Sequence, residues 1–147
     1  MDIFDYRIEH EEFYKHLREQ QGDGFYYLAG PYSGPTRLHQ KLNIQVMQAY
    51  HYVVTSMGLT AVAMPVLCRQ YDHTDGLAGR PHRGWLEDCE RIIRSSKGVL
   101  IMPRSDQSAG VKHELEFAKS LGVATYHLPD MNMVVLSLVM RGLEILQ

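Results

Sequence analysis

The glutamate at position 114 has the residue type and the setting of a catalytic carboxylate. It belongs to "DQSAGVKHELEFAKSLG", residues 106–122, whose apolar spacing predicts an amphipathic helix. At about 100° per residue, Glu114 falls inside the apolar arc of this helix. The arc consists of Val111, Leu115, Phe117, Ala118 and Leu121. A buried unpaired charge is costly, so such a carboxylate is usually partnered or catalytic. The alternative is a surface carboxylate on a helix that is turned by a residue or two.

Two small residues precede Glu114 and leave space for a ligand. Gly110 lies one turn earlier on the same face, where it leaves room beside the carboxylate. Ser108 stands at the expected N-cap, and a helix N-terminus with a hydroxyl and free amides suits a phosphate. The helical rise separates Ser108 from Glu114 by roughly 9 Å, enough for a small phosphorylated metabolite. A serine N-cap also has a purely structural interpretation.

A second carboxylate, Asp88, lies at the border of the apolar face of a predicted helix over 85–96. The side expected to face water carries Glu87, Glu90, Arg91 and Arg94. Two carboxylates at one cleft permit general acid catalysis together with nucleophilic attack. Asp88 is therefore a candidate partner for Glu114.

Other polar motifs fit no established metal or cofactor site. "YLAGPYSG", residues 27–34, is a predicted strand followed by a turn whose amides can bind an anion, but it matches neither dinucleotide nor Walker fingerprints. The polar segment 67–83 is interpreted as a mobile lid that touches substrate. The residues there that suggest a metal have no compact zinc spacing, so we expect no metal and no cofactor. They are Cys68, Asp72, His73 and His82.

Strands and helices are expected to alternate along the chain. Apolar runs predict strands at 25–30, 59–66, 98–103 and 123–129, and periodic segments predict helices at 3–20, 36–57, 85–96, 106–122 and 131–146. This order predicts an α/β fold: a single doubly wound (flavodoxin/Rossmann-like) parallel sheet of four to five strands, with helices on both faces and an extra N-terminal helix. The site then lies beyond the carboxyl ends of the strands. We expect a helical extension over 1–22 and the α/β domain over 23–147.

Composition excludes several classes of protein. The chain has 147 residues, 45% apolar and 22% charged, which is typical of one globular domain. Its net charge of −2 provides no basic face for nucleic acid. No apolar run reaches the roughly 18 residues of a membrane span, and two cysteines make no disulfide framework. We therefore expect a cytoplasmic protein that binds neither nucleic acid nor membrane.

The last predicted helix, 131–146, is apolar almost all the way round. Only Ser137, Arg141 and Glu144 form a narrow polar strip. Such helices are buried, and a terminal one is often buried against a second subunit. An interface between two copies and a core helix that closes the monomer are both consistent with this pattern.

Together these segments resemble the nucleoside 2-deoxyribosyltransferase superfamily, and within it the 2′-deoxynucleoside 5′-monophosphate N-glycosidases. The resemblance spans about residues 25–142. Four segments carry it, in the same order and spacing: "YLAGPYSG", "DCERIIRSSKGVLIMP", "SAGVKHELEFA" and "VLSLVMRG".

The resemblance implies a role for each matching residue. Glu114 would attack C1′ of the sugar and form a covalent ester, while Asp88 would protonate the departing base and then assist water. Tyr27 would hold Glu114 in its attacking pose. The residues expected to hold the 5′-phosphate are Gly30, Ser33, Ser108 and Gly110, together with Ser137 from the other subunit of a homodimer. Relatives that act on free nucleosides tend to carry an acid at the position of Ser108, so the serine favours a monophosphate.

The implied function is hydrolysis of the N-glycosidic bond of a (2′-deoxy)nucleoside 5′-monophosphate, which gives free base and (deoxy)ribose 5-phosphate. The substrate is thus a small nucleotide. Ser33 stands where the glycosidases carry an arginine, and the base preference stays open. Two alternatives are a nucleoside 2-deoxyribosyltransferase that exchanges bases, and a non-catalytic nucleotide-binding module.

Overall fold

The computed structural model describes residues 2–67 and 82–146. Within these ranges, four strands form one parallel sheet in the order β2-β1-β3-β4. The strands are β1 (Tyr26–Ala29), β2 (Ala61–Val62), β3 (Val99–Ile101) and β4 (Thr125–His127). The predicted parallel sheet is confirmed, and its two central strands are fully buried.

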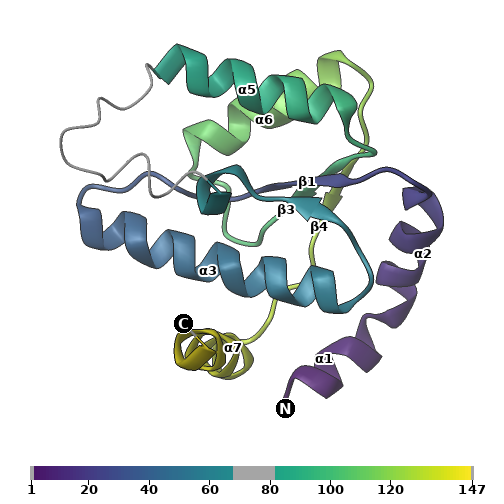
Figure 1. Ribbon diagram of the computed structural model, residues 1–147, viewed down its shortest axis with the longest axis vertical. Coiled ribbons are helices and arrows are strands. Elements are labelled where there is room, and N and C mark those ends of the chain that lie inside the picture. The colour runs from purple at the N-terminus through teal and green to yellow at the C-terminus, as the bar shows by residue number, and fades with distance from the viewer. Residues whose placement is uncertain (1, 68–81, 147) are drawn as a thin grey trace.

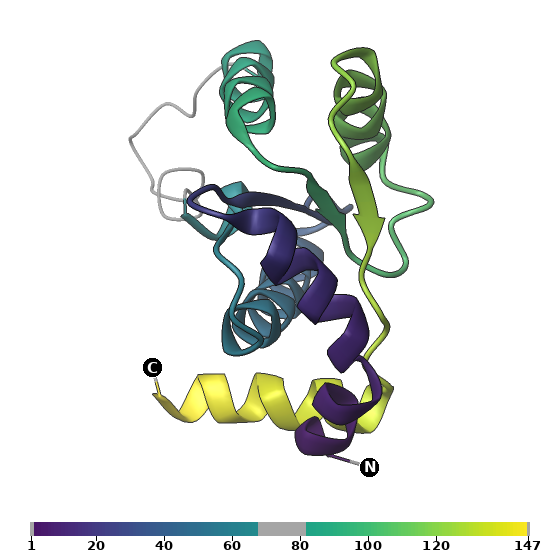
Figure 2. The ribbon, with the colours of Figure 1, turned by 90° about the vertical axis from the view of Figure 1, so that its right-hand side faces the viewer.

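Helices cover both faces of this sheet, as predicted. On one face lie α5 (His82–Ser95) and α6 (Ala109–Ser120). On the other lie α3 (Arg37–Ser56) and, beyond it, α7 (Met133–Leu146), as Figures 1 and 2 show from two directions. None of the described helices is both long enough and apolar enough to cross a bilayer.

Alternating side chains along the central strands divide the core into two clusters. Because successive residues of a strand point to opposite faces, β1 contributes to both clusters. The cluster beneath the sheet, toward α3 and α7, takes Tyr26, Leu28, Leu100 and Met102 from the central strands and their ends. The other cluster lies between the sheet and the helices α5 and α6, and it takes Tyr27, Ala29, Val99 and Ile101 from the central strands. The pairing of Tyr27 with Val99 fixes this register.

The predicted N-terminal helix is divided in two at His10, where the backbone turns out of helical geometry. Its parts are α1 (Ile3–Glu9), which begins with a capping box of Asp2 and Asp5, and α2 (Glu11–Gln21). In an unbroken helix, residues eight apart would be separated by roughly 12 Å along the axis. The bend at His10 accompanies direct contact between Tyr6 and Tyr14, whose hydroxyls lie 2.8 Å apart.

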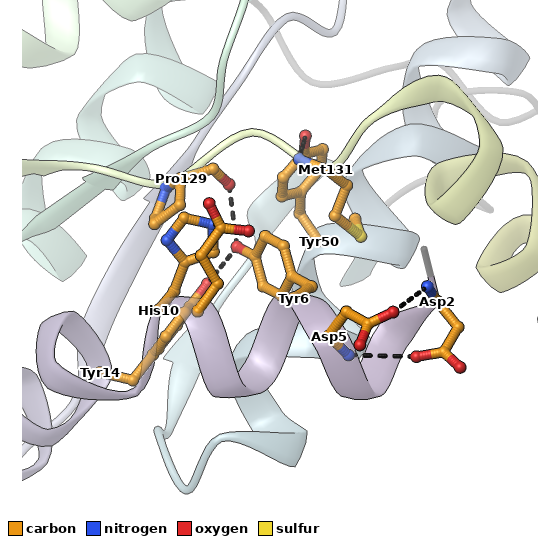
Figure 3. A network of polar contacts seen from close by, with 9 residues as sticks. Asp2, Asp5, Tyr6, His10, Tyr14, Tyr50, Pro129 and Met131 are labelled. Atoms are coloured by element: carbon orange, nitrogen blue, oxygen red, sulfur yellow. Dashed lines mark hydrogen bonds and ion pairs between the residues drawn. The ribbon is translucent and has the colours of Figure 1, made fainter.

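Buried tyrosines tie this N-terminal extension to the segment before α7 (Figure 3). The hydroxyl of Tyr6 donates to the carbonyl oxygen of Pro129 at 2.8 Å. Nearby, Tyr50 of α3 donates to Asp130 at 2.8 Å and accepts from the amide of Met131 at 3.1 Å. The extension therefore belongs to the same core as α3 and α7.

The second predicted strand is much shorter than expected. Only Ala61 and Val62 pair with β1, and residues 64–67 form a helical turn instead. Pro65 explains the difference, because it has no N–H to give to a ladder and fits the first turn of a helix.

Candidate active site

Helix α6 turns Glu114 toward the sheet, as its spacing predicts. Ser108 caps the helix by accepting from the amide of Val111 at 3.2 Å, and Val111 and Ala118 are buried on its inner face. The Oε2 atom of Glu114 is buried and has no hydrogen-bond partner in the part of the chain that the structure describes. An oxygen of this kind costs free energy unless a ligand or a proton satisfies it.

The surroundings of Glu114 raise the pKa of its carboxyl from 4.5 to about 7. Burial is the largest cause, because it disfavours the charged form. A hydrogen bond with Tyr27 and the charge of the neighbouring His113 act in the opposite direction. Near neutral pH the carboxyl is thus divided between its acid and its ionised form, so a large fraction is an anion that can act as a nucleophile.

Tyr27 connects β1 with both helices above it. The residue is buried in the sheet, and its hydroxyl interacts with Glu114 of α6 and with the thiol of Cys89 on α5. Burial, followed by the charge of Glu114, raises the pKa of Tyr27 well above its usual value. The hydroxyl therefore keeps its proton and acts as a donor toward Glu114. Tyr27 and Glu114 are two predicted site residues that the fold brings together.

Asp88 lies on α5, one residue before Cys89. Its side chain is 25% exposed, and its Oδ1 accepts from Arg91 at 2.9 Å. One turn earlier, the ring of Trp85 stacks against Tyr32, which follows β1, with centroids 6.3 Å apart. The start of α5 and the segment after β1 are therefore joined by two stacked aromatic rings, of which Trp85 lies three residues before Asp88.

Residues predicted to bind phosphate occupy different environments. Gly110 has open space beside it, since an added Cβ would meet only the hydroxyl of Ser108, at 3.9 Å. Gly30 is buried, and a Cβ there would lie 2.3 Å from the sulfur of Met102, so a larger residue would require the Met102 side chain to move. Ser33 is exposed in the loop after β1, where Asn43 of α3 donates to its carbonyl oxygen at 3.3 Å.

Ser137 is separated from Glu114 by the sheet. It is exposed on α7, whereas Glu114 lies on α6 at the opposite face (Figure 2). Within one chain these two residues do not share a site. Ser137 can meet a Glu114 only across a contact between two molecules.

The residues that suggested a metal fall largely outside the described ranges. Cys68, Asp72 and His73 lie there, as does the side chain of His82, so the interpretation of 67–83 as a lid also lies outside them. Across residues 2–67 and 82–146, no group of three or more histidine, cysteine or acidic side chains could hold a metal ion.

One ion pair beside Glu114 in the sequence was not expected from the sequence alone. Glu90 of α5, expected to face water, lies with its Oε1 3.0 Å from Nε2 of His113 on α6. A single helical wheel cannot identify such a pair, because the contact depends on how α5 and α6 pack. The only hint was the position of His113, next to Glu114 in the sequence.

Comparisons of the chain with family models, with curated proteins and with solved structures found no significant match. Its function must therefore be argued from the fold and from this group of side chains.

The link between Tyr27 and Glu114 leads to a first prediction. Tyr27→Phe keeps the ring but removes the hydroxyl that stabilises the ionised carboxyl, so the pKa of Glu114 should rise above about 7, by about one pH unit. The carboxyl signals in a carbon-13 NMR titration measure this, with Glu114→Gln identifying the resonance. Tyr26→Phe, which changes a tyrosine on the other face of β1, should leave the Glu114 titration unchanged. An unchanged titration in Tyr27→Phe would contradict the contact.

Proposed function

We propose that this protein hydrolyses the N-glycosidic bond of a (2′-deoxy)nucleoside 5′-monophosphate, with Glu114 as the nucleophile. One observation carries the proposal: the carboxyl of a half-buried glutamate, with one fully buried oxygen that has no partner among the described residues and a pKa of about 7, held beside the hydroxyl of Tyr27. A buried carboxylate oxygen without a partner costs free energy in the free protein. A nucleophile that must be screened from water explains its presence.

The chemistry proceeds in two displacements at C1′ of the sugar. In the first, an oxygen of ionised Glu114 bonds to C1′ as the bond from C1′ to the base nitrogen breaks, and the base leaves with that electron pair and takes up a proton. Asp88, which must be protonated when the substrate is bound, supplies this proton and is left as a carboxylate. In the second, water attacks C1′ and the ester bond to Glu114 breaks, while Asp88 accepts the proton of the water. The products are free base and (deoxy)ribose 5-phosphate, and the configuration at C1′ is retained.

Ser108 and Gly110 support the choice of a phosphorylated substrate. The first turn of α6 has no acidic residue, and space is open beside Gly110 next to the capping hydroxyl. A phosphate placed there would be attracted by the positive end of the helix dipole. An acid at the same position would repel the phosphate.

A panel of ribo- and deoxynucleoside 5′-monophosphates tests the proposal, with free base detected by chromatography. Base released by the wild type but not by Glu114→Ala supports hydrolysis. Release that requires a second, acceptor base indicates a deoxyribosyltransferase. Binding of a nucleotide without turnover indicates a nucleotide-binding module. If no nucleotide of the panel is bound or hydrolysed, the proposed function is wrong.

We also propose that two copies pair through α7, so that Ser137 reaches the phosphate in the site of its partner. One side of α7 packs into the core through Val135, Leu136 and Val139. On the other side, Met133, Val134, Leu138 and Ile145 are each more than half exposed within one chain. An exposed apolar surface of this kind is typical of a protein–protein contact.

Leu138→Glu should convert the dimer to a monomer, because the change places a charge in an apolar contact. We expect the dissociation constant to rise about 30-fold or more, as measured by analytical ultracentrifugation. Leu121→Glu is the matched control, since Leu121 is exposed on the opposite face of the molecule, after α6. A wild-type protein that sediments as a monomer would exclude this part of the proposal.

A further inference from the structure

The loops that follow β3 and β4 are joined by an ion pair. Because β3 and β4 are parallel neighbours, their carboxyl ends lie at the same edge of the sheet. After β3, Nη1 of Arg104 donates to Oδ2 of Asp130, which follows β4, at 3.0 Å. The two side chains are 53% and 50% exposed, so this contact alone contributes little to stability. Its position matters more, because the loop after β3 leads into the N-cap of α6.

The backbone of Arg104 has a conformation that favours glycine. Its φ is 63°, in the left-handed region, and among the described residues no other non-glycine has a positive φ. Arg104 follows Pro103 in a turn, and proline followed by a positive φ is the pattern of a type II turn, where glycine or asparagine usually stands. An arginine at such a position requires contacts that hold it there. The ion pair with Asp130 is one of them.

Asp130 is itself held on its other side. Its Oδ1 accepts from the hydroxyl of Tyr50 at 2.8 Å, and Tyr50 is fully buried on α3. The same hydroxyl accepts from the amide of Met131 at 3.1 Å. One residue before Asp130, the carbonyl oxygen of Pro129 accepts from Tyr6 of the N-terminal extension at 2.8 Å. Two buried tyrosines, both shown in Figure 3, therefore fix the segment that carries Asp130.

A series of hydrogen bonds connects the turn at Arg104 with the N-cap of α6. Ser105, the next residue, is buried, and its hydroxyl donates to the carbonyl oxygen of Met102 at 2.7 Å. The amide of Ser108 donates to the carbonyl oxygen of Ser105 at 3.0 Å. Ser108 in turn accepts from the amide of Val111 at 3.2 Å. The place of Arg104 therefore helps to determine where α6 begins.

We propose that Arg104 and Asp130 are positioning residues: their ion pair fixes the loop after β3 and so places Ser108 to receive the phosphate of the substrate. Neither side chain needs to touch the substrate for this role. The inference rests on the proposed function, and it gives the N-terminal extension a part in that function, because Tyr6 holds the segment that carries Asp130.

Asp130→Asn is the main test of this role. Asparagine can still accept from Tyr50, but it has no second oxygen to accept from Arg104. KM should rise about fivefold, because Ser108 is less well placed to bind the phosphate. We expect kcat to stay within about twofold of the wild type, since Glu114 lies in the second turn of α6 and has its own contact with β1.

Arg104→Asn removes the other half of the ion pair and introduces a residue type that tolerates a positive φ. It should raise KM as much as Asp130→Asn does, and the double variant should raise KM no further than either single variant. Arg104→Lys keeps the positive charge and should recover part of the loss. Lys97→Asn is the matched control, because it removes one exposed positive charge just before β3, at the opposite end of that strand. Its KM should equal that of the wild type.

Backbone order parameters from nitrogen-15 NMR relaxation provide a readout that needs no substrate. In Asp130→Asn and Arg104→Asn, the value for the amide of Ser108 should fall from about 0.85 toward about 0.6, while that of Tyr27 in the sheet stays near about 0.85. This difference supports the fixing of the loop even if no nucleotide is hydrolysed. An unchanged value at Ser108 would overturn the inference, as would an equal fall at Tyr27 or a loss of kcat at unchanged KM.

Discussion

Glu114→Gln is expected to abolish release of base, lowering kcat/KM by about 10³-fold or more while the protein remains folded. The amide has almost the same shape as the acid, but it cannot supply the oxygen that bonds to C1′. Its effect should therefore exceed that of a substitution that only changes the ionisation of Glu114, such as Tyr27→Phe. Base release is measured by chromatography at several values of pH, because a lowered fraction of anion would recover in alkali and a missing nucleophile would not.

Glu116→Gln is the matched control for this experiment. It makes the same chemical change two residues further along α6, on an exposed side chain. We expect its activity to equal that of the wild type. A second measurement, the mass of the peptide containing residue 114 after acid quench during turnover, should show the added sugar phosphate only in the wild type and in Glu116→Gln. Retained turnover by Glu114→Gln would rule out the covalent mechanism.

Glu114→Gln should also be more stable than the wild type above neutral pH. In the unfolded chain the Glu114 carboxyl loses its proton at about pH 4.5, whereas in the folded protein it does so at about pH 7. Between these values the folded state holds a proton that the unfolded state has lost, so this residue destabilises the fold progressively as pH rises. The full effect is roughly 3 kcal/mol above about pH 8 and vanishes below about pH 4.

Urea denaturation of both proteins at a series of pH values measures this effect. The difference in free energy of unfolding between Glu114→Gln and wild type should grow with pH, because all other titrating groups cancel in the difference. The corresponding difference for Glu116→Gln should stay flat, since that side chain is exposed. A flat difference for Glu114→Gln as well would mean that its carboxyl is not buried in solution.

Much of the architecture followed from periodicity in the sequence. The alternation of strands and helices predicts the parallel sheet, and the apolar arc of 106–122 places the Glu114 carboxyl on the inner side of α6. The position of Glu114 depends on spacing within one helix, and the sheet depends on the order of the elements along the chain, so both can be read from the sequence without knowing how the elements pack. The capping by Ser108 is also local, because it involves an amide three residues away.

Features that depend on packing between elements could not be predicted in this way. The bend at His10 is one such feature. Two others are the contact of Tyr6 with Pro129 and the pairing of Glu90 with His113, because the whole fold sets the distance between the segments that they join. The shortened β2 is an exception, since Pro65 in the sequence already argued against a long strand. For Ser137, the sequence placed it on α7, but only the arrangement of the helices puts the sheet between it and Glu114.

The alternation along β1 has a consequence for how this protein can evolve. Tyr26 serves the cluster that holds α3, α7 and the N-terminal extension, while Tyr27, the next residue, serves the cluster around Glu114. Natural selection for a durable scaffold and natural selection for a new substrate can thus act on adjacent codons without opposing one another. Substitutions in α5 and α6 can then accumulate while the core cluster on the side of α3 stays unchanged.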